Sequence, residues 1–423
     1  MASPDAKTGT NIQEEPLTWY SWVVAILCLL TFAISFVCRN VWSTALPVAA
    51  PDLKISMTAA GGLMTAFYIG YVISNFFTGF MVDRFGPRKT LAVSSLFTGL
   101  FTLLIPFSAS YSVIFLLRIG AGIASGPLFS GCTKFQLAWF PQSVRATAMG
   151  LVMAGPTVGM AIASSGFAPI IENQGWQQAF IYAGIIALVI AVLMFFFGKE
   201  RGLALVKPDQ AKKVLTAEEK AEERKGLLEI ILSRQFILGT FGQLFAVGHL
   251  NAFSTWVVLF FTQAQGFSLE QAGAIFGVTT FAMLFTTPLG GVVSDVLKTR
   301  KKVVHIGNIA NFIFTLALIM TKNITLLWVF MFAKAILGAL GNNLNTIMAE
   351  SVKGPYAGRA MGIYNGVCQL GSVIFPTLIG FILDTTGNFN IVIISLASLA
   401  LFISLMVAFM NETYQKPADT KTA

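Results

Sequence analysis

Long apolar stretches separated by short polar loops run along almost the whole chain. Twelve of them reach the length of about 20 mostly apolar residues that a helix needs to cross a lipid bilayer. They lie near residues 19–46, 58–81, 90–108, 111–133, 146–171, 177–198, 232–262, 269–293, 303–321, 324–347, 360–383 and 388–411. Backbone polar groups in lipid must be hydrogen-bonded within their own segment, so we expect helices and not strands. The pattern predicts an all-α membrane protein with twelve transmembrane helices.

One polar segment divides these spans into two groups of six. Residues 199–231 carry charges of both signs, and their stretch "LTAEEKAEERKGLLEII" is typical of a short amphipathic helix at a membrane surface. We therefore divide the chain into five parts. They are a tail over 1–18, a six-helix bundle over 19–198, a linker over 199–231, a second bundle over 232–411 and a tail over 412–423.

Charged side chains make up only 11% of the 423 residues, against roughly 25% in an ordinary soluble domain. This composition excludes a soluble enzyme. The net charge of +9 is explained by basic loops at a membrane surface, so we expect no nucleic-acid partner. Lys and Arg concentrate in alternate loops, as at residues 84–89 and 298–302. The positive-inside rule places these loops and both termini in the cytoplasm.

Two of the basic loops carry the same motif, Gly-x3-Asp-x4-Arg-Lys. It occurs after the second span and again after the eighth, which is the equivalent position in the other half. Such a pair indicates an internal duplication. We assign the motif a structural and gating role, because its Gly permits close helix approach and its Asp is suited to cap a helix or pair with a cation. Its residues are Gly79, Asp83, Arg84, Gly86, Arg88, Gly291, Asp295 and Arg300.

With twelve spans, the division into six and six, and the doubled loop motif, the chain resembles the major facilitator superfamily over nearly its whole length. The resemblance implies two pseudo-symmetric six-helix bundles around a central cavity. It also implies alternating access by a rocker switch, usually in a monomer.

Three cations lie within the spans, where charge is rare and usually functional. They are Arg39 in the first span, Arg118 in the fourth and Lys334 in the tenth. No Asp or Glu occupies the middle of any span, so the three lack an obvious counter-ion. A bound anion would neutralise them, and Arg is suited to grip a carboxylate, sulfonate or phosphate. We expect Arg118 and Lys334 to face each other; the alternative for all three is pairing with backbone carbonyls.

Further polar groups accompany these cations. The offset that relates Asp83 to Asp295 leads from Arg39 to Asn251 in the seventh span, and His249 lies beside it. His249 is our candidate for proton coupling, because histidine titrates near physiological pH. The remaining candidate ligands lie in the second and eleventh spans, where bonds between helices are the alternative role. They are Tyr68, Tyr71, Asn365 and Gln369.

The sequence around Arg39, the "LRIGAG" of the fourth span and "GIYNGVCQLGSVIFPTLIG" of the eleventh resemble the anion:cation symporter family. That resemblance implies transport of sugar acids, other carboxylates or organophosphates. Sugar-acid members carry an Asp before the first-span Arg and a Glu seven residues beyond the fourth-span Arg, where this chain has Cys38 and Ser125. Three couplings therefore stay open: a proton carried by His249, a proton carried by the substrate, or exchange of one anion for another.

The leading hypothesis is a secondary transporter of a small organic anion in the plasma membrane, as in a bacterial inner membrane. A carboxylate is the first choice of substrate group, and a sulfonate or phosphate ester the second. One rival is a proton-coupled exporter of drugs or metabolites, which the Gly155-Pro156 pair in the fifth span favours. Another is a receptor or scaffold that transports nothing. The sequence offers no nucleophile–base pair, metal-ligand spacing or phosphate-binding glycine loop, so we expect no enzyme, metal or cofactor.

Overall fold

The computed structural model describes residues 17–201, 217–354 and 356–414, and these residues form helices joined by short turns. Eleven helical segments are long and apolar enough to cross a membrane. The ninth expected span corresponds to helix α14 (Lys301–Ala317), which has 17 residues. An all-helical membrane fold is confirmed. The tails over 1–16 and 415–423, and linker residues 202–216, lie outside the described residues.

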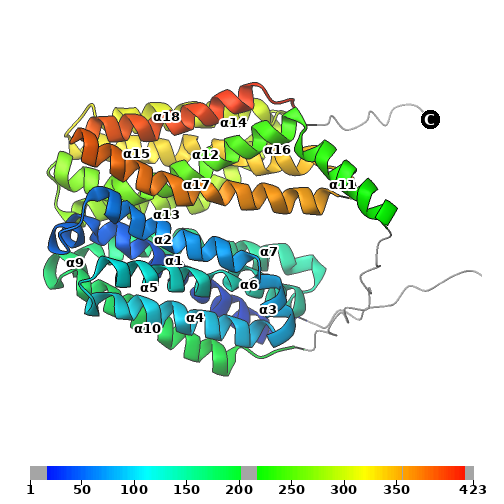
Figure 1. The fold of residues 1–423 in the computed structure, drawn as a ribbon, viewed down its shortest axis with the longest axis horizontal. Helices are drawn as coiled ribbons and strands as arrows, with labels where there is room; N and C mark the ends of the chain where they lie inside the picture. Colours follow the sequence, from blue (N-terminus) through cyan, green and yellow to red (C-terminus); the bar gives the residue numbers. More distant parts are fainter. Residues whose placement is uncertain (1–16, 202–216, 355, 415–423) are drawn as a thin grey trace, which may run out of the picture.

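The N-terminal bundle holds the first six spans (Figure 1). Several spans consist of two or three helical pieces, because a Gly-Pro pair or a turn interrupts them. The helices are α1 (Trp19–Asp52), α2 (Met57–Asn75), α3 (Thr78–Phe85), α4 (Pro87–Leu104), α5 (Tyr111–Ser125), α6 (Pro127–Trp139), α7 (Gln142–Met153), α8 (Gly155–Ala161), α9 (Ala168–Gln174) and α10 (Trp176–Phe197).

The C-terminal bundle lies alongside the first (Figure 1). A separate helix, α11 (Ala217–Ile231), precedes it and covers part of the charged linker. The other helices are α12 (Arg234–Leu259), α13 (Leu269–Val296), α14, α15 (Ile324–Gly338), α16 (Leu344–Ser351), α17 (Ala357–Thr386) and α18 (Phe389–Ala408).

Two helix crossings join the bundles, and they are copies of each other. Gly61 of α2 lies against the Pro376 carbonyl of α17, and Gly273 of α13 lies against the Ser164 carbonyl that follows α8. A Cβ atom at either glycine would collide with that carbonyl, so both crossings require glycine. The two glycines are 212 residues apart in the sequence, and so are their two partners. The internal duplication therefore extends to the contact between the bundles.

Two carboxylates reinforce these crossings at the end of the molecule opposite the basic loops, which we call the opposite end. Asp384 of α17 accepts hydrogen bonds from the Met57 and Thr58 amides at the start of α2, at 2.9 and 2.7 Å. Glu172 of α9 accepts one from the Glu270 amide at the start of α13, at 2.8 Å. The two acceptors are again 212 residues apart. Each carboxylate thus caps a helix of the other bundle, where negative charge is favourable.

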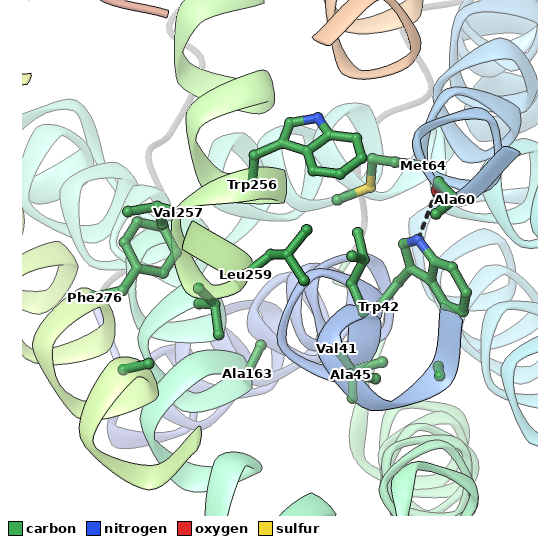
Figure 2. Close-up of a cluster of buried hydrophobic side chains, with 14 of the residues drawn as sticks. Val41, Trp42, Ala45, Ala60, Met64, Ala163, Trp256, Val257, Leu259 and Phe276 are labelled. Atoms are coloured by element: carbon green, nitrogen blue, oxygen red, sulfur yellow. Dashed lines mark hydrogen bonds between the residues drawn. The ribbon is translucent and has the colours of Figure 1, made fainter. Parts of the chain in front are cut away.

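An apolar layer fills the space between the bundles at the opposite end. Figure 2 shows Trp42 and Met64 of the N-terminal bundle beside Trp256 and Leu259 of the C-terminal one. Both indole N–H groups are satisfied, because Trp42 donates to Ala60 and Trp256 to Pro376, at 2.9 and 3.0 Å. Both tryptophan side chains are buried. The bundles are therefore closed against each other at the opposite end.

The doubled motif lies at the other end, which we call the basic end. In the first copy Asp83 pairs with Lys134 at 2.7 Å, and in the second Arg300 pairs with Asp295 at 2.6 Å. Arg300 also contacts Glu350 at 3.2 Å. The motif therefore joins helices within each bundle in this conformation.

Candidate functional site

Arg39 lies in α1 between the bundles and is surrounded by aromatic rings. Its Cζ atom is 4.2 Å from the ring centroid of Phe36, 4.9 Å from those of Phe67 and Tyr71, and 5.3 Å from that of Tyr68. The side chain is only 5% exposed, and its Nε–H has no hydrogen-bond partner in the described part of the chain. A buried donor on a charged group that lacks a partner is costly. Arg39 is therefore prepared to bind an acceptor from outside the chain.

A chain of hydrogen bonds leads from this arginine into the second bundle. Tyr68 of α2 donates to the amide oxygen of Asn251 in α12. The Asn251 amide donates to Ser372 of α17 at 2.9 Å, and Ser372 contacts the Gln369 oxygen at 3.4 Å. The structure thus brings four of the predicted residues, Arg39, Tyr68, Asn251 and Gln369, into one polar layer between the bundles. Sequence reasoning missed Ser372, although its position three residues after Gln369 puts both on one helix face.

The layer becomes more exposed towards the basic end. Tyr68 and Ser372 are buried, whereas Tyr71 and Gln369 are half-buried and Asn365 is exposed. In both α2 and α17 the more exposed residues are the ones nearer the basic loops.

Arg118 of α5 has a different environment from Arg39. It is fully buried, and its guanidinium donates to the carbonyls of Leu63, Cys38 and Arg39 at 3.0, 3.2 and 3.2 Å. The first carbonyl belongs to α2 and the others to α1. Arg118 therefore follows the carbonyl-pairing alternative in this conformation and fixes the backbone on which Arg39 stands.

Lys334 of α15 contacts α12, the helix that corresponds to α1 in the C-terminal bundle. Its Nζ atom is 3.5 Å from Nε2 of His249 in α12 and 4.0 Å from the ring centroid of Phe253. His249 is buried, and its Nδ1 atom lies 2.9 Å from the Leu396 carbonyl of α18. Arg118 and Lys334 each turn to the first helix of their own bundle. Each cation thus has its contacts within its own bundle, and the expectation that the two face each other stays a prediction.

The two positions where sugar-acid members carry carboxylates hold small side chains bonded to carbonyls. Cys38 Sγ contacts the Ala183 carbonyl at 3.8 Å, and Ser125 donates to the Gly122 carbonyl at 3.0 Å. Within the described residues, no group of three His, Cys, Asp or Glu side chains is arranged to hold a metal ion. The site is therefore built from cations, aromatic rings and neutral polar groups.

The family model of the Major Facilitator Superfamily matches residues 27–299 and 251–423. The chain belongs to this superfamily. It is therefore a multi-pass membrane transporter by family and not an enzyme, as the sequence predicted.

Relatives of known name match most of the chain. A hexuronate transporter of Bacillus subtilis is 28% identical, covering 94% of this chain and 96% of its own length. A probable sulfoacetate transporter of Cupriavidus necator, SauU, is 26% identical, covering 87% of this chain and 88% of its own. The crystal structure of a D-xylose-proton symporter matches with a TM-score of 0.72 at 17% identity, over 92% of this chain and 97% of that one. This last likeness shows the shared fold.

Proposed function

We propose that this protein is a secondary transporter of a small organic anion, and that the anionic group binds Arg39 between the two bundles. The observation that carries the proposal is the buried Nε–H of Arg39, which has no hydrogen-bond partner among the residues that the structure describes. A carboxylate or sulfonate oxygen supplies that partner and neutralises the charge. The names of the relatives agree, because hexuronate carries a carboxylate and sulfoacetate carries both groups.

The neighbouring groups suit an anion with a polar body. Tyr68, Asn251 and Gln369 offer hydroxyl and amide groups, which hydrogen-bond sugar hydroxyls as readily as they bond each other. Tyr71 and Asn365 lie further towards the basic end, where a substrate would arrive. Arg118 acts as a positioning residue, because its bonds to the α1 and α2 carbonyls hold Arg39 in place.

We propose alternating access, in which the closed opposite end is one of the two states. We propose that the basic end faces the cytoplasm, since its loops carry most of the Lys and Arg near the spans. The structure then represents a conformation closed to the outside. To open outward, the protein must separate the apolar layer around Trp42 and Trp256 and break the caps formed by Asp384 and Glu172. Neutralisation of Arg39 by the anion lowers the cost of bringing polar groups from both bundles together.

Counterflow into vesicles tests the proposal. Purified protein is reconstituted into liposomes preloaded with unlabelled D-glucuronate or sulfoacetate, and uptake of the same labelled compound is followed. D-xylose, a neutral sugar, is the matched control compound. We expect rapid counterflow of at least one anion and none of D-xylose. No counterflow of either anion, together with transport of D-xylose or a lipophilic cation, would contradict the proposal.

A further inference from the structure

In the contact between His249 and Lys334, the hydrogen-bond donor and acceptor can be assigned. The Leu396 carbonyl is only an acceptor, so the Nδ1 atom 2.9 Å away from it must carry a hydrogen. A neutral imidazole has one N–H, which leaves a lone pair on Nε2. This lone pair faces the Lys334 ammonium at 3.5 Å. The pair therefore holds one exchangeable proton between Nζ and Nε2.

The surroundings hold no acid that would favour a second proton. Lys334 is the one charged residue of α15, and α18 has no titratable side chain. The Asp and Glu residues of helices α12 to α18 lie within three positions of a helix end. The other histidine, His305 of α14, bonds to Ser404 and not to this pair. Protonation of Nε2 would thus place an imidazolium against an ammonium, with no carboxylate among these helices to offset the repulsion.

An anion at Arg39 would change that balance. His249 lies two residues from Asn251 on α12, and Asn251 is bonded to Tyr68, whose ring contacts Arg39. The rings of His249 and Phe253 stack with centroids 5.8 Å apart, and Lys334 lies over the same Phe253 ring. The face of the Phe253 ring can hold the Lys334 ammonium by a cation–π interaction when a protonated His249 repels it. A negative charge that arrives in the polar layer therefore favours a second positive charge on the pair.

We infer that His249 and Lys334 form the transporter's proton site, which takes up one proton together with the anion. The inference rests on the proposed function and selects symport among the three couplings. In the empty state Lys334 is an ammonium and His249 is neutral. With the anion bound, a proton from solvent adds to Nε2 while the Nδ1–H keeps its bond to Leu396. The anion and the proton are both released on the other side of the membrane, so a monoanion and its proton cross with no net charge.

Proton uptake measured beside counterflow tests this pair. Vesicles contain a pH-sensitive dye, and D-glucuronate and sulfoacetate serve as the probe anions. The variants are His249→Gln and, as matched control, His305→Gln, which removes the chain's only other histidine. We expect anion addition to acidify vesicles that hold wild-type protein or His305→Gln. His249→Gln should keep counterflow, which needs no net proton movement, and should lose acidification by at least tenfold.

Lys334→Gln provides a second test that does not depend on the folding of His249→Gln. If one proton is taken up with the anion, linkage requires the anion Kd of the wild type to fall by about tenfold for each unit by which the pH is lowered. Without the ammonium, the pair lacks one of the two groups that hold the exchanged proton, so this dependence should flatten to about twofold. Counterflow without acidification in the wild type would overturn the inference and leave the proposed function standing. Acidification that persists in His249→Gln would overturn it as well. Absence of counterflow of either anion in the wild type, together with transport of D-xylose or a lipophilic cation, would overturn both.

Discussion

The two bundles share their outer framework and differ at the centre. Glycine crossings, carboxylate caps and the loop motif recur at a separation of 212 residues. At the same separation, however, Arg39 of the first bundle corresponds to the neutral Asn251 of the second. The cations of the fourth and tenth spans differ too, since Arg118 binds backbone carbonyls and Lys334 contacts a histidine. The repeated features are thus the ones that hold the bundles together, whereas the polar residues at the centre differ between the two bundles.

The largest expected effect separates Arg118 of the fourth span from Lys334 of the tenth. Arg118→Gln removes three charge-assisted bonds to carbonyls, each worth about 1.5–3 kcal/mol. We expect the free energy of unfolding to fall by roughly 3 kcal/mol or more, while Lys334→Gln changes it by less than about 1 kcal/mol. Thermal unfolding of the purified variants in detergent measures both. Equal losses in the two would show that the two cations have the same role.

The caps at the opposite end should show the next largest effect. Asp384→Asn weakens a cap that joins α17 to α2, and Glu172→Gln weakens its copy between α9 and α13. A carboxylate at a helix N-terminus contributes about 0.3–2 kcal/mol, so amide hydrogen exchange at residues 57–61 and 270–273 should accelerate by roughly 2- to 30-fold.

The control for the caps is Asp52→Asn. Asp52 lies at the same end but bonds Trp176 and Gln177 within its own bundle. We expect this variant to leave exchange at both helix starts unchanged. If it accelerates exchange as much as Asp384→Asn does, the caps have no special part in closing the opposite end.

A smaller effect is expected for the hydrogen bond between Tyr68 and Asn251, which links the centres of the two bundles. Tyr68→Phe removes the hydroxyl that donates to Asn251 and keeps the ring over Arg39. A neutral hydrogen bond contributes about 0.5–1.5 kcal/mol, so the anion Kd should rise by roughly 2- to 12-fold. Isothermal titration calorimetry measures it. Tyr182→Phe, which removes a hydroxyl bonded to Gln174 at the opposite end, should leave the Kd unchanged.

The smallest effect concerns a pair of carboxylates, one after the last span of each bundle. Glu412 accepts hydrogen bonds from Thr299 and from the Arg300 and Lys301 amides. Burial acts to raise the pKa of Glu412, but these bonds together hold it below its usual value. Glu412 therefore contributes stability above its unfolded-state pKa and loses it as pH falls through the lowered one. Its copy, Glu200, accepts no such amide bond among the described residues.

We expect Glu412→Gln to lower stability at neutral pH by about 0.3–1 kcal/mol and to abolish this part of the acid dependence. Glu200→Gln should do neither. Apparent melting temperatures between pH 3 and 7 measure both variants. Identical acid profiles for Glu412→Gln and the wild type would show that the cap contributes nothing.

The sequence predicted the architecture well because hydropathy and a duplicated motif are one-dimensional signals. Helix α1 begins at Trp19 and α10 ends at Phe197, close to the expected limits of the first bundle. The breaks within spans were less predictable, because they depend on local turns such as the one between Asn75 and Thr78.

The centre was only partly predictable. The absence of intramembrane acids draws attention to Arg39, Arg118 and Lys334, but it says nothing about where each side chain points. Arg118 turns to backbone carbonyls, and no sequence pattern encodes that choice because the carbonyls exist in every helix. The contact of Lys334 with His249 likewise depends on how α15 and α12 rotate against each other.

Direct binding to Arg39 tests the central claim most simply. Calorimetry would measure the Kd of D-glucuronate and sulfoacetate for the wild type, Arg39→Gln and Arg234→Gln, at one pH and ionic strength. Arg234 is an exposed arginine at the basic-end start of α12 and is the matched control. A lost charge-assisted bond of about 1.5–3 kcal/mol predicts that Arg39→Gln weakens the anion by roughly 10- to 150-fold or more. Arg234→Gln should bind like the wild type. Equal affinity of Arg39→Gln and the wild type for an anion that binds would contradict the account.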